Sequence, residues 1–147
     1  MPHKQPVSIL LIIHTPELDV LLLERNDFTD AWQSVTGSRE GEEPLIETAQ
    51  RELAEETGLR VELAQIKDWH ECHDFEIFEI WRHRYAPGVT TNTEHVFSVC
   101  LPLACEVELA AKEHRRFKWV NWQQAAEMVF SPSNAEALRQ LPERVAH

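Results

Sequence analysis

Residues 37–59 read GSREGEEPLIETAQRELAEETGL, and this stretch constrains the fold and the chemistry more than any other part of the chain. Glutamates, glycines and one arginine stand there at fixed offsets, in the pattern G-x5-E-x7-R-E-L-x-E-E-x-G-L. A match of this length is far more specific than a short glycine motif. The positions that define the pattern are Gly37, Glu43, Arg51, Glu52, Glu55, Glu56 and Gly58.

The second half of this stretch predicts a helix over residues 45–57. Pro44 suits the first helical position, because proline lacks the backbone N–H that would have no partner there. Gly58 suits the left-handed residue that often follows the end of a helix. At about 100° per residue, one apolar stripe of the helix would face the core. That stripe contains Leu45, Ile46, Ala49 and Leu53.

The glutamates of the predicted helix would project from one side of it. Glu52 and Glu56 are four residues apart and Glu55 lies three after Glu52, spacings that bring side chains together on a helix. Carboxylates this close repel one another, and a bound divalent cation removes that penalty. Their oxygens suit Mg²⁺ or Mn²⁺, which also bind substrate phosphates. An acidic helix face is usually only a solvated surface, but the coinciding glycines and arginine favour a metal site.

Two other residues of the pattern have expected structural roles. Arg51 stands four residues before Glu55 and is expected to orient a carboxylate and to take no part in the chemistry. Glu43 is expected to brace the loop that precedes the helix against the helix itself. Neither role would require contact with a substrate.

The length and composition predict one acidic domain. The 147 residues are enough for a core, and the net charge of −11 argues against a nucleic-acid scaffold. Cys72, Cys100 and Cys105 form no C-x-x-C pattern, which is typical of reduced thiols in a cytosolic protein. The apolar run at residues 7–13 is too short to span a membrane and follows no basic leader. We therefore expect a cytoplasmic protein without a membrane or nucleic-acid partner.

Apolar patterning predicts several strands around the central helix. Asn121 with Gln124 resembles a helix cap, and Ser133 with Glu136 opens a last short helix. Many strands with few helices indicate a mixed α/β layered domain. The predicted strands cover residues 7–14, 20–24, 32–35 (leading into a loop at Gly37), 61–66, 75–84 (with a change of face), 95–101 and 117–120, with a hairpin turn at 15–19.

The pattern of residues 37–59 resembles the Nudix box, the signature of hydrolases that cleave nucleoside diphosphates linked to another moiety. The resemblance implies an α/β/α sandwich with a mixed sheet and a central catalytic helix, in a single domain over residues 1–147. It also implies the metal ligands and catalytic acids. These are Glu52, Glu55, Glu56 and Glu113, the last from a later loop, with the carbonyl of Gly37 able to complete the coordination of Mg²⁺. Glu94 and Glu76 are weaker alternatives to Glu113.

Further stretches resemble a bacterial subgroup of this family that acts in folate biosynthesis. That subgroup releases pyrophosphate from a pterin triphosphate and leaves the monophosphate. Arg82 and Arg84 are candidates to bind phosphate, or they are a solubilising strand end. Tyr85 could stack on a flat ring, and Trp32 with Gln33 could line its pocket, although Trp32 is equally suited to the core. The stretches are PVSIL (6–10), WQSVTGS (32–38), FEIF (75–78), RHRYAPGV (82–89) and NTE (92–94).

Rival functions remain open at this point. The first is a pyrophosphohydrolase of (deoxy)nucleoside triphosphates that cleans the nucleotide pool, because the box does not contain the groups that read the ring. The second is a Nudix-like module that binds a nucleotide without catalysis, although such modules typically lose box glutamates. RNA decapping is disfavoured by the negative charge. The sequence does not decide the substrate, the number of metal ions, the general base or the oligomeric state.

Overall fold

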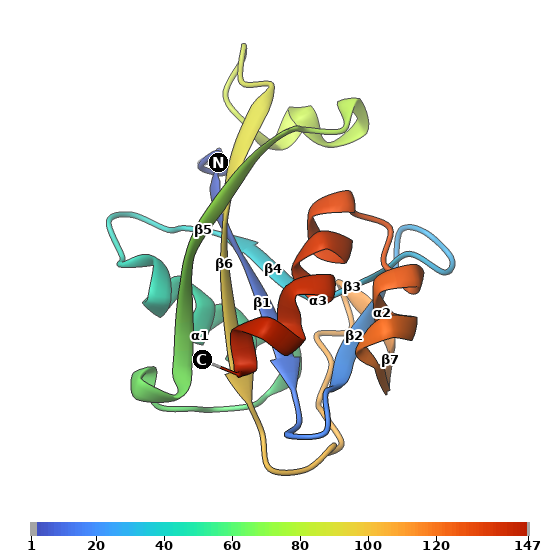
Figure 1. Cartoon of the computed structure of the whole chain (residues 1–147). Coiled ribbons are helices and arrows are strands. Elements are labelled where there is room, and N and C mark those ends of the chain that lie inside the picture. The colour runs from blue at the N-terminus through green and yellow to red at the C-terminus, as the bar shows by residue number, and fades with distance from the viewer. Residues whose placement is uncertain (1–2, 147) are drawn as a thin grey trace.

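The computed structural model describes residues 3–146, and strand β1 (Val7–His14) lies at the centre of its sheet (Figure 1). Successive side chains of a strand point to opposite faces, so β1 supplies both sides of the core. Ile9, Leu11 and Ile13 enter one apolar cluster, and Leu10 and Ile12 enter the other. A strand buried on both faces reads as a continuous apolar run.

The sheet is mixed. Strand β1 pairs in parallel with β6 along its whole length, and its other edge pairs antiparallel with β4 and, at His14, with β2. Strand β2 continues to β3 and β7, while β5 forms the outer edge beyond β6. The strands are β1, β2 (Asp19–Arg25), β3 (Trp32–Gln33), β4 (Val35–Ser38), β5 (Ile66–Glu76), β6 (Thr91–Cys100) and β7 (His114–Asn121).

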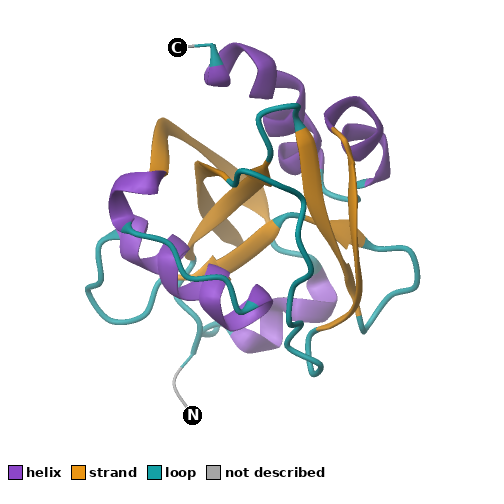
Figure 2. Ribbon diagram, turned by 90° about the horizontal axis from the view of Figure 1, so that it is seen from below, coloured by secondary structure: helices purple, strands orange, loops and turns teal. Residues whose placement is uncertain are grey.

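Helices cover both faces of this sheet, which confirms the predicted α/β/α sandwich (Figures 1 and 2). Helix α1 (Leu45–Thr57) packs Ala49 and Leu53 into the cluster that contains the odd-numbered residues of β1. Helices α2 (Trp122–Met128) and α3 (Pro132–Val145) pack on the opposite cluster. No helix within residues 3–146 combines the length and the apolar character that crossing a bilayer requires.

Helix α1 has the predicted bounds, but its first residue differs in role from the prediction. Pro44 has φ −58° and ψ 144°, so it is the N-cap and not the first helical residue. Gly58 has φ 75°, the left-handed conformation that the sequence predicted. The apolar stripe is only partly buried, because Leu45 and Ile46 lie at the margin of the core.

The predictions for residues 61–84 were largely wrong. Residues 61–66 are not a strand: they contain the short helix η1 (Leu63–Gln65), and β5 begins only at Ile66. Strand β5 then runs through a polar stretch, because as an edge strand it buries few side chains, among them Ile66 and Trp69. The predicted strand at 75–84 is mostly the short helix η2 (Glu79–Arg84). Gly37 lies inside β4 and not in a loop.

The C-terminal helices begin at capping residues that only partly match the prediction. Asn121 caps α2 as predicted, its Oδ1 accepting from the backbone N–H of Gln123 at 3.0 Å. Helix α3 is capped by Ser131, not Ser133, and it extends to Val145. Pro132 follows the cap at a position where its missing N–H costs no hydrogen bond. Leu138 and Leu141 of α3 are buried on the sheet.

The burial of Leu53 predicts its contribution to stability. We expect Leu53→Ala to lower the free energy of unfolding by about 2–5 kcal/mol, because the side chain is fully buried between α1 and the sheet. Urea denaturation followed by circular dichroism measures this change. The control is Leu103→Ala, which should change stability by less than about 0.5 kcal/mol because Leu103 is 72% exposed. Equal effects of the two substitutions would contradict the assigned packing.

Candidate active site

The most unusual side chain on α1 is Glu56. It is 1% exposed, and neither of its carboxylate oxygens receives a hydrogen bond from any residue within 3–146. The carboxyl of Glu52, one helical turn away, places a second acid near it. Burial and the neighbouring Glu52 raise the pKa of Glu56 well above its usual range. A buried acid that receives no hydrogen bond is costly and therefore calls for a ligand.

Glu52 is held against the backbone of β4. A methyl group built on Gly37 would lie 2.1 Å from the carboxyl carbon of Glu52, so only glycine allows this approach. Burial raises the pKa of Glu52 as well, although Arg51 works in the opposite direction. The glycine of the sequence pattern therefore makes room for one of its glutamates.

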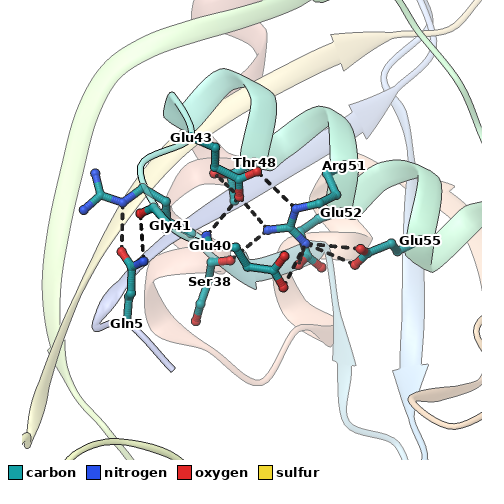
Figure 3. Close-up of polar contacts among 10 residues, drawn as sticks. Gln5, Ser38, Glu40, Gly41, Glu43, Thr48, Arg51, Glu52 and Glu55 are labelled. Atoms are coloured by element: carbon teal, nitrogen blue, oxygen red, sulfur yellow. Dashed lines mark hydrogen bonds and ion pairs between the residues drawn. The ribbon is translucent and has the colours of Figure 1, made fainter. Parts of the chain in front are cut away.

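Arg51 organises the acidic side of α1 (Figure 3). Its guanidinium donates to Glu43 at 2.7 and 3.2 Å, to Glu52 at 2.9 Å and to the carbonyl of Ser38 at 3.0 Å. A further ion pair of 3.2 Å reaches Glu55. One side chain thus links the loop before the helix, strand β4 and the acidic ridge.

Glu43 is the structural acid of the group. Besides Arg51, its carboxylate accepts from the hydroxyl of Thr48 at 2.9 Å and from the backbone N–H of Glu40 at 3.0 Å. The hydrogen bonds from Arg51 lower the pKa of Glu43 to about 2. A carboxylate with this many donors has no capacity to spare for a metal ion.

A loop residue and a histidine complete the acidic cluster. Glu56, Glu113 and His114 each offer one ligand atom, and these atoms lie within 4.8 Å of one another. Burial, followed by the charge of Arg25, lowers the pKa of His114 to about 4, so its ring is neutral at pH 7. His114 was not predicted from the sequence. Its position next to Glu113 was the available signal, but burial is what makes it part of the site.

These residues fit a divalent cation. Within residues 3–146 no donor reaches the carboxylate oxygens of Glu56, and ligand atoms of Glu113 and of the neutral His114 imidazole lie close to them. Glu55 is 55% exposed and lines the same cleft. A bound cation would remove the repulsion that otherwise keeps these acids from ionising together.

Basic residues border the acidic cleft. Lys4, Arg25 and Arg84 line it, and they also line a second cavity beside it. The backbone N–H of Lys4 donates to the carbonyl of Arg84 at 2.8 Å, and Arg25 is held by two hydrogen bonds of 2.8 Å to Asp27. The three cations form a neck, which we call the basic neck, between the two cavities. Lys4 and Arg25 were not identified from the sequence.

The second cavity has aromatic walls. Phe78 and Trp81 of the η2 region stack at a centroid distance of 5.1 Å, and Phe130 approaches both rings. Arg25 lies 4.4 Å above the ring of Trp81. We call this space the aromatic cavity. Its volume of about 210 Å³ greatly exceeds the roughly 10–15 Å³ that one water molecule requires.

The structure brings together only some of the residues predicted to bind substrate. Gln33 and Arg84 line both cavities, and Tyr85 lines the aromatic cavity. Trp32 and Arg82 line neither of these cavities. Trp32 is buried in the core below Arg116 and Lys118, and Arg82 donates to the carbonyl of Ile77 and to Glu76. As substrate contacts, Trp32 and Arg82 therefore stay predictions from the sequence that the cavity linings do not support.

The weaker alternatives for the additional acid lie elsewhere. Glu76 is mostly exposed and forms an ion pair with Arg82. Glu94 is buried in the aromatic cavity, away from the acidic cluster. Glu113 is the one of these three acids that lines the acidic cleft and lies beside Glu56.

Comparison with known proteins places the chain in a family. Residues 4–141 match the model of the NUDIX domain. Dihydroneopterin triphosphate diphosphatase of Escherichia coli (strain K12) is 44% identical over 94% of this chain and 93% of its own length. The Haemophilus influenzae protein of the same name is 40% identical over 95% of this chain and 89% of its own. The structure of the E. coli dihydroneopterin triphosphate pyrophosphohydrolase aligns with a TM-score of 0.88 at 42% identity, covering 95% of this chain and 97% of the other.

The ion pair of Glu43 predicts a pH dependence of stability. Because the pKa of Glu43 is lowered to about 2 on folding, the ion pair stabilises the protein above the usual carboxyl pKa and is lost as the pH falls from about 4.5 towards 2. We expect Glu43→Gln to lower the free energy of unfolding by on the order of 2–3 kcal/mol at pH 7, with a smaller difference at pH 3. Urea denaturation at a series of pH values measures this difference.

The control for this experiment is Glu17→Gln, in the exposed turn after β1. It should change stability by less than about 0.5 kcal/mol at every pH. A difference for Glu43→Gln that stayed constant between pH 7 and pH 3 would contradict the assigned ion pair.

Proposed function

The chain belongs to the NUDIX domain family, and from this premise we propose that it hydrolyses dihydroneopterin triphosphate to dihydroneopterin monophosphate and pyrophosphate. The chain is a Nudix hydrolase, and its relatives with the diphosphatase name align over nearly their whole length. The observation that carries the substrate proposal is the arrangement of the two cavities. An acidic cleft suited to a metal–phosphate group is joined by the basic neck to a cavity suited to a flat ring.

Nudix hydrolases generally use a divalent metal, and we propose Mg²⁺ for this chain, with Mn²⁺ able to replace it. Glu52, Glu55, Glu56 and Glu113 would hold the cation, together with the carbonyl of Gly37. Oxygen-rich ligand sets of this kind suit Mg²⁺, which also binds phosphates. When bound, the cation neutralises charge on the phosphates and makes water a better nucleophile. The buried position of Glu56 supports this proposal, because a cation satisfies oxygens that receive no hydrogen bond from residues 3–146.

The residues of the chain would position the phosphates and accept a proton. Lys4, Arg25 and Arg84 of the basic neck would bind the phosphate nearest to the ring, because cationic side chains at a phosphate site fix its position. Water attacks the phosphorus of that group, the bond to the neighbouring phosphate breaks, and pyrophosphate leaves. One carboxylate among Glu52, Glu55, Glu56 and Glu113 takes the proton of the attacking water. Positioning and electrostatics account for most of the rate in such reactions.

We further propose a cytosolic protein with a single Nudix domain that acts on a small-molecule triphosphate. The family match over residues 4–141 supports the single domain. The free cysteines Cys72, Cys100 and Cys105 support a reducing compartment.

A substrate panel tests the proposed reaction. We expect dihydroneopterin triphosphate to be hydrolysed with the highest kcat/KM, with dATP and 8-oxo-dGTP slower, and with pyrophosphate rather than orthophosphate as the product. Pyrophosphate is measured with a coupled assay in the presence of Mg²⁺. Preference for either nucleotide would favour the nucleotide-pool function. Absence of pyrophosphate release from every triphosphate would favour a module that binds nucleotides without catalysis.

The role of Glu56 predicts a separation of activity from stability. We expect Glu56→Gln to lower turnover by several orders of magnitude at saturating Mg²⁺, because it removes a charged oxygen from the acidic cluster. The fold should persist, since glutamine replaces an acid whose burial already disfavours its charge. Steady-state kinetics and thermal unfolding measure the two effects.

The matched control for Glu56→Gln is Glu47→Gln, on the same helix but exposed to solvent. Its turnover should remain close to that of the wild type. Near-normal turnover of Glu56→Gln, or a similar loss in both variants, would disprove the role assigned to Glu56.

A further inference from the structure

The floor of the aromatic cavity contains two buried polar side chains that the proposed hydrolysis does not use. Asn92 and Glu94 lie two residues apart on β6 and therefore point to the same face of the sheet. They are 2% and 5% exposed. Next to them on the floor are Ser8 and Leu10 of β1, and the register pairs Ser8 with Glu94. Polar groups in such a place need partners.

Asn92 has an acceptor without a donor. Its Nδ2 donates to the hydroxyl of Ser8 at 2.7 Å, but its Oδ1 receives no hydrogen bond from any residue within 3–146. The side chain lines the aromatic cavity, so a ligand in that cavity is the available source of the missing donor. Buried acceptors without partners are rare in proteins and usually have a functional reason.

The carboxylate of Glu94 can also accept more hydrogen bonds than the described residues give it. Its Oε1 accepts from the hydroxyl of Ser133 at 2.8 Å, near the start of α3. It forms no ion pair with the residues that the structure describes, and its burial raises the pKa of the carboxyl. A carboxylate can accept about four hydrogen bonds, so one serine leaves most of them free. Two parallel N–H donors from a planar ligand would suit it best.

We propose that Glu94 and Asn92 read the hydrogen-bonding edge of the substrate's ring, and that they select rings with an amino group beside a ring N–H. In this arrangement Glu94 accepts from the ring N–H and from the amino group, while Asn92 Oδ1 accepts the second amino hydrogen. Phe78, Trp81 and Phe130 line the same cavity and would supply apolar contacts to the ring. This proposal rests on the proposed function for the position of the phosphates, which the basic neck would hold at the mouth of the cavity.

The chemistry of this edge restricts the ring. A 2-amino-4-oxo pyrimidine ring, as in pterins and in guanine, offers the required adjacent donors. Adenine offers an amino group next to a ring nitrogen that is an acceptor. That nitrogen would face the carboxylate of Glu94, and two acceptors repel each other. Sites built around a hydrogen bond reject ligands that lack it much more strongly than apolar pockets reject a missing methylene.

Binding of neopterin, which carries the ring without phosphates, tests the proposal apart from catalysis. We expect the wild type to bind neopterin, measured through its fluorescence, with guanosine as a competitor and adenosine without effect. Glu94→Gln should weaken binding about 10- to 100-fold, because it presents a donor to the donors of the ring. The glutamine oxygen can still accept from Ser133, so the fold is expected to persist. Asn92→Ala provides a second variant, with the same direction of change.

The matched control is Thr93→Val, between the two residues but on the opposite face of β6, where its hydroxyl donates to Asp74. It should bind neopterin like the wild type. In hydrolysis, Glu94→Gln should lower kcat/KM for dihydroneopterin triphosphate and leave that for dATP unchanged or higher. A loss that affected both substrates equally would indicate a structural role and overturn the proposal.

The remaining outcomes separate this proposal from the proposed function. If no triphosphate releases pyrophosphate but neopterin binding still depends on Glu94, the proposed function fails. The proposal that Glu94 recognises the ring is then still supported. If dihydroneopterin triphosphate is hydrolysed while the wild type does not bind neopterin, or while both variants bind it normally, the reading of the ring is overturned. If Glu94→Gln does not fold, the result for Asn92→Ala decides.

Discussion

The hydrogen bonds of the Arg51 guanidinium hold the acidic side of α1 against β4, and the rest of the site depends on this contact. Arg51 gives its best-placed donors to Glu43 and one to Glu52, but Glu56 receives none. The loop before α1 therefore carries an acid, Glu43, whose charge is satisfied by several donors, and the helix itself carries another, Glu56, whose charge is not. This unequal distribution separates the acid that stabilises the fold from the acid that is available to a cation.

The two halves of the site come from opposite layers of the sandwich. Helix α1 contributes the acidic cleft from one side of the sheet, and the start of α3 contributes to the aromatic cavity on the other. Gly37 and Ser38 of β4 line both spaces. A triphosphate joined to a flat ring has the matching division, with strong negative charge at one end and an apolar surface at the other. The fold can thus hold both ends of one substrate on a rigid sheet.

Some parts of the fold and of the site were difficult to predict for identifiable reasons. Strand β5 is polar because it lies at the edge of the sheet, so it lacks the apolar alternation that reveals a strand. His114 and Lys4 belong to no motif and join the site only because β7 and the N-terminal segment bring them to it. Trp32 is of a residue type that often lines ligand pockets, but its position on β3 directs its side chain into the core.

The sequence by itself determined the family, the helix over residues 45–57 and the set of acids on it, because these depend on spacing within one helix. The strand at residues 7–14 was equally clear, since an apolar run buried on both faces needs no partner to be recognised. Only the tertiary structure decided which acid lies without a donor, which cations border the cleft, and that Asn92 and Glu94 lie on the floor of an aromatic cavity. These properties result from burial and from the pairing of distant strands. Neither can be inferred from the spacing of residues along the chain.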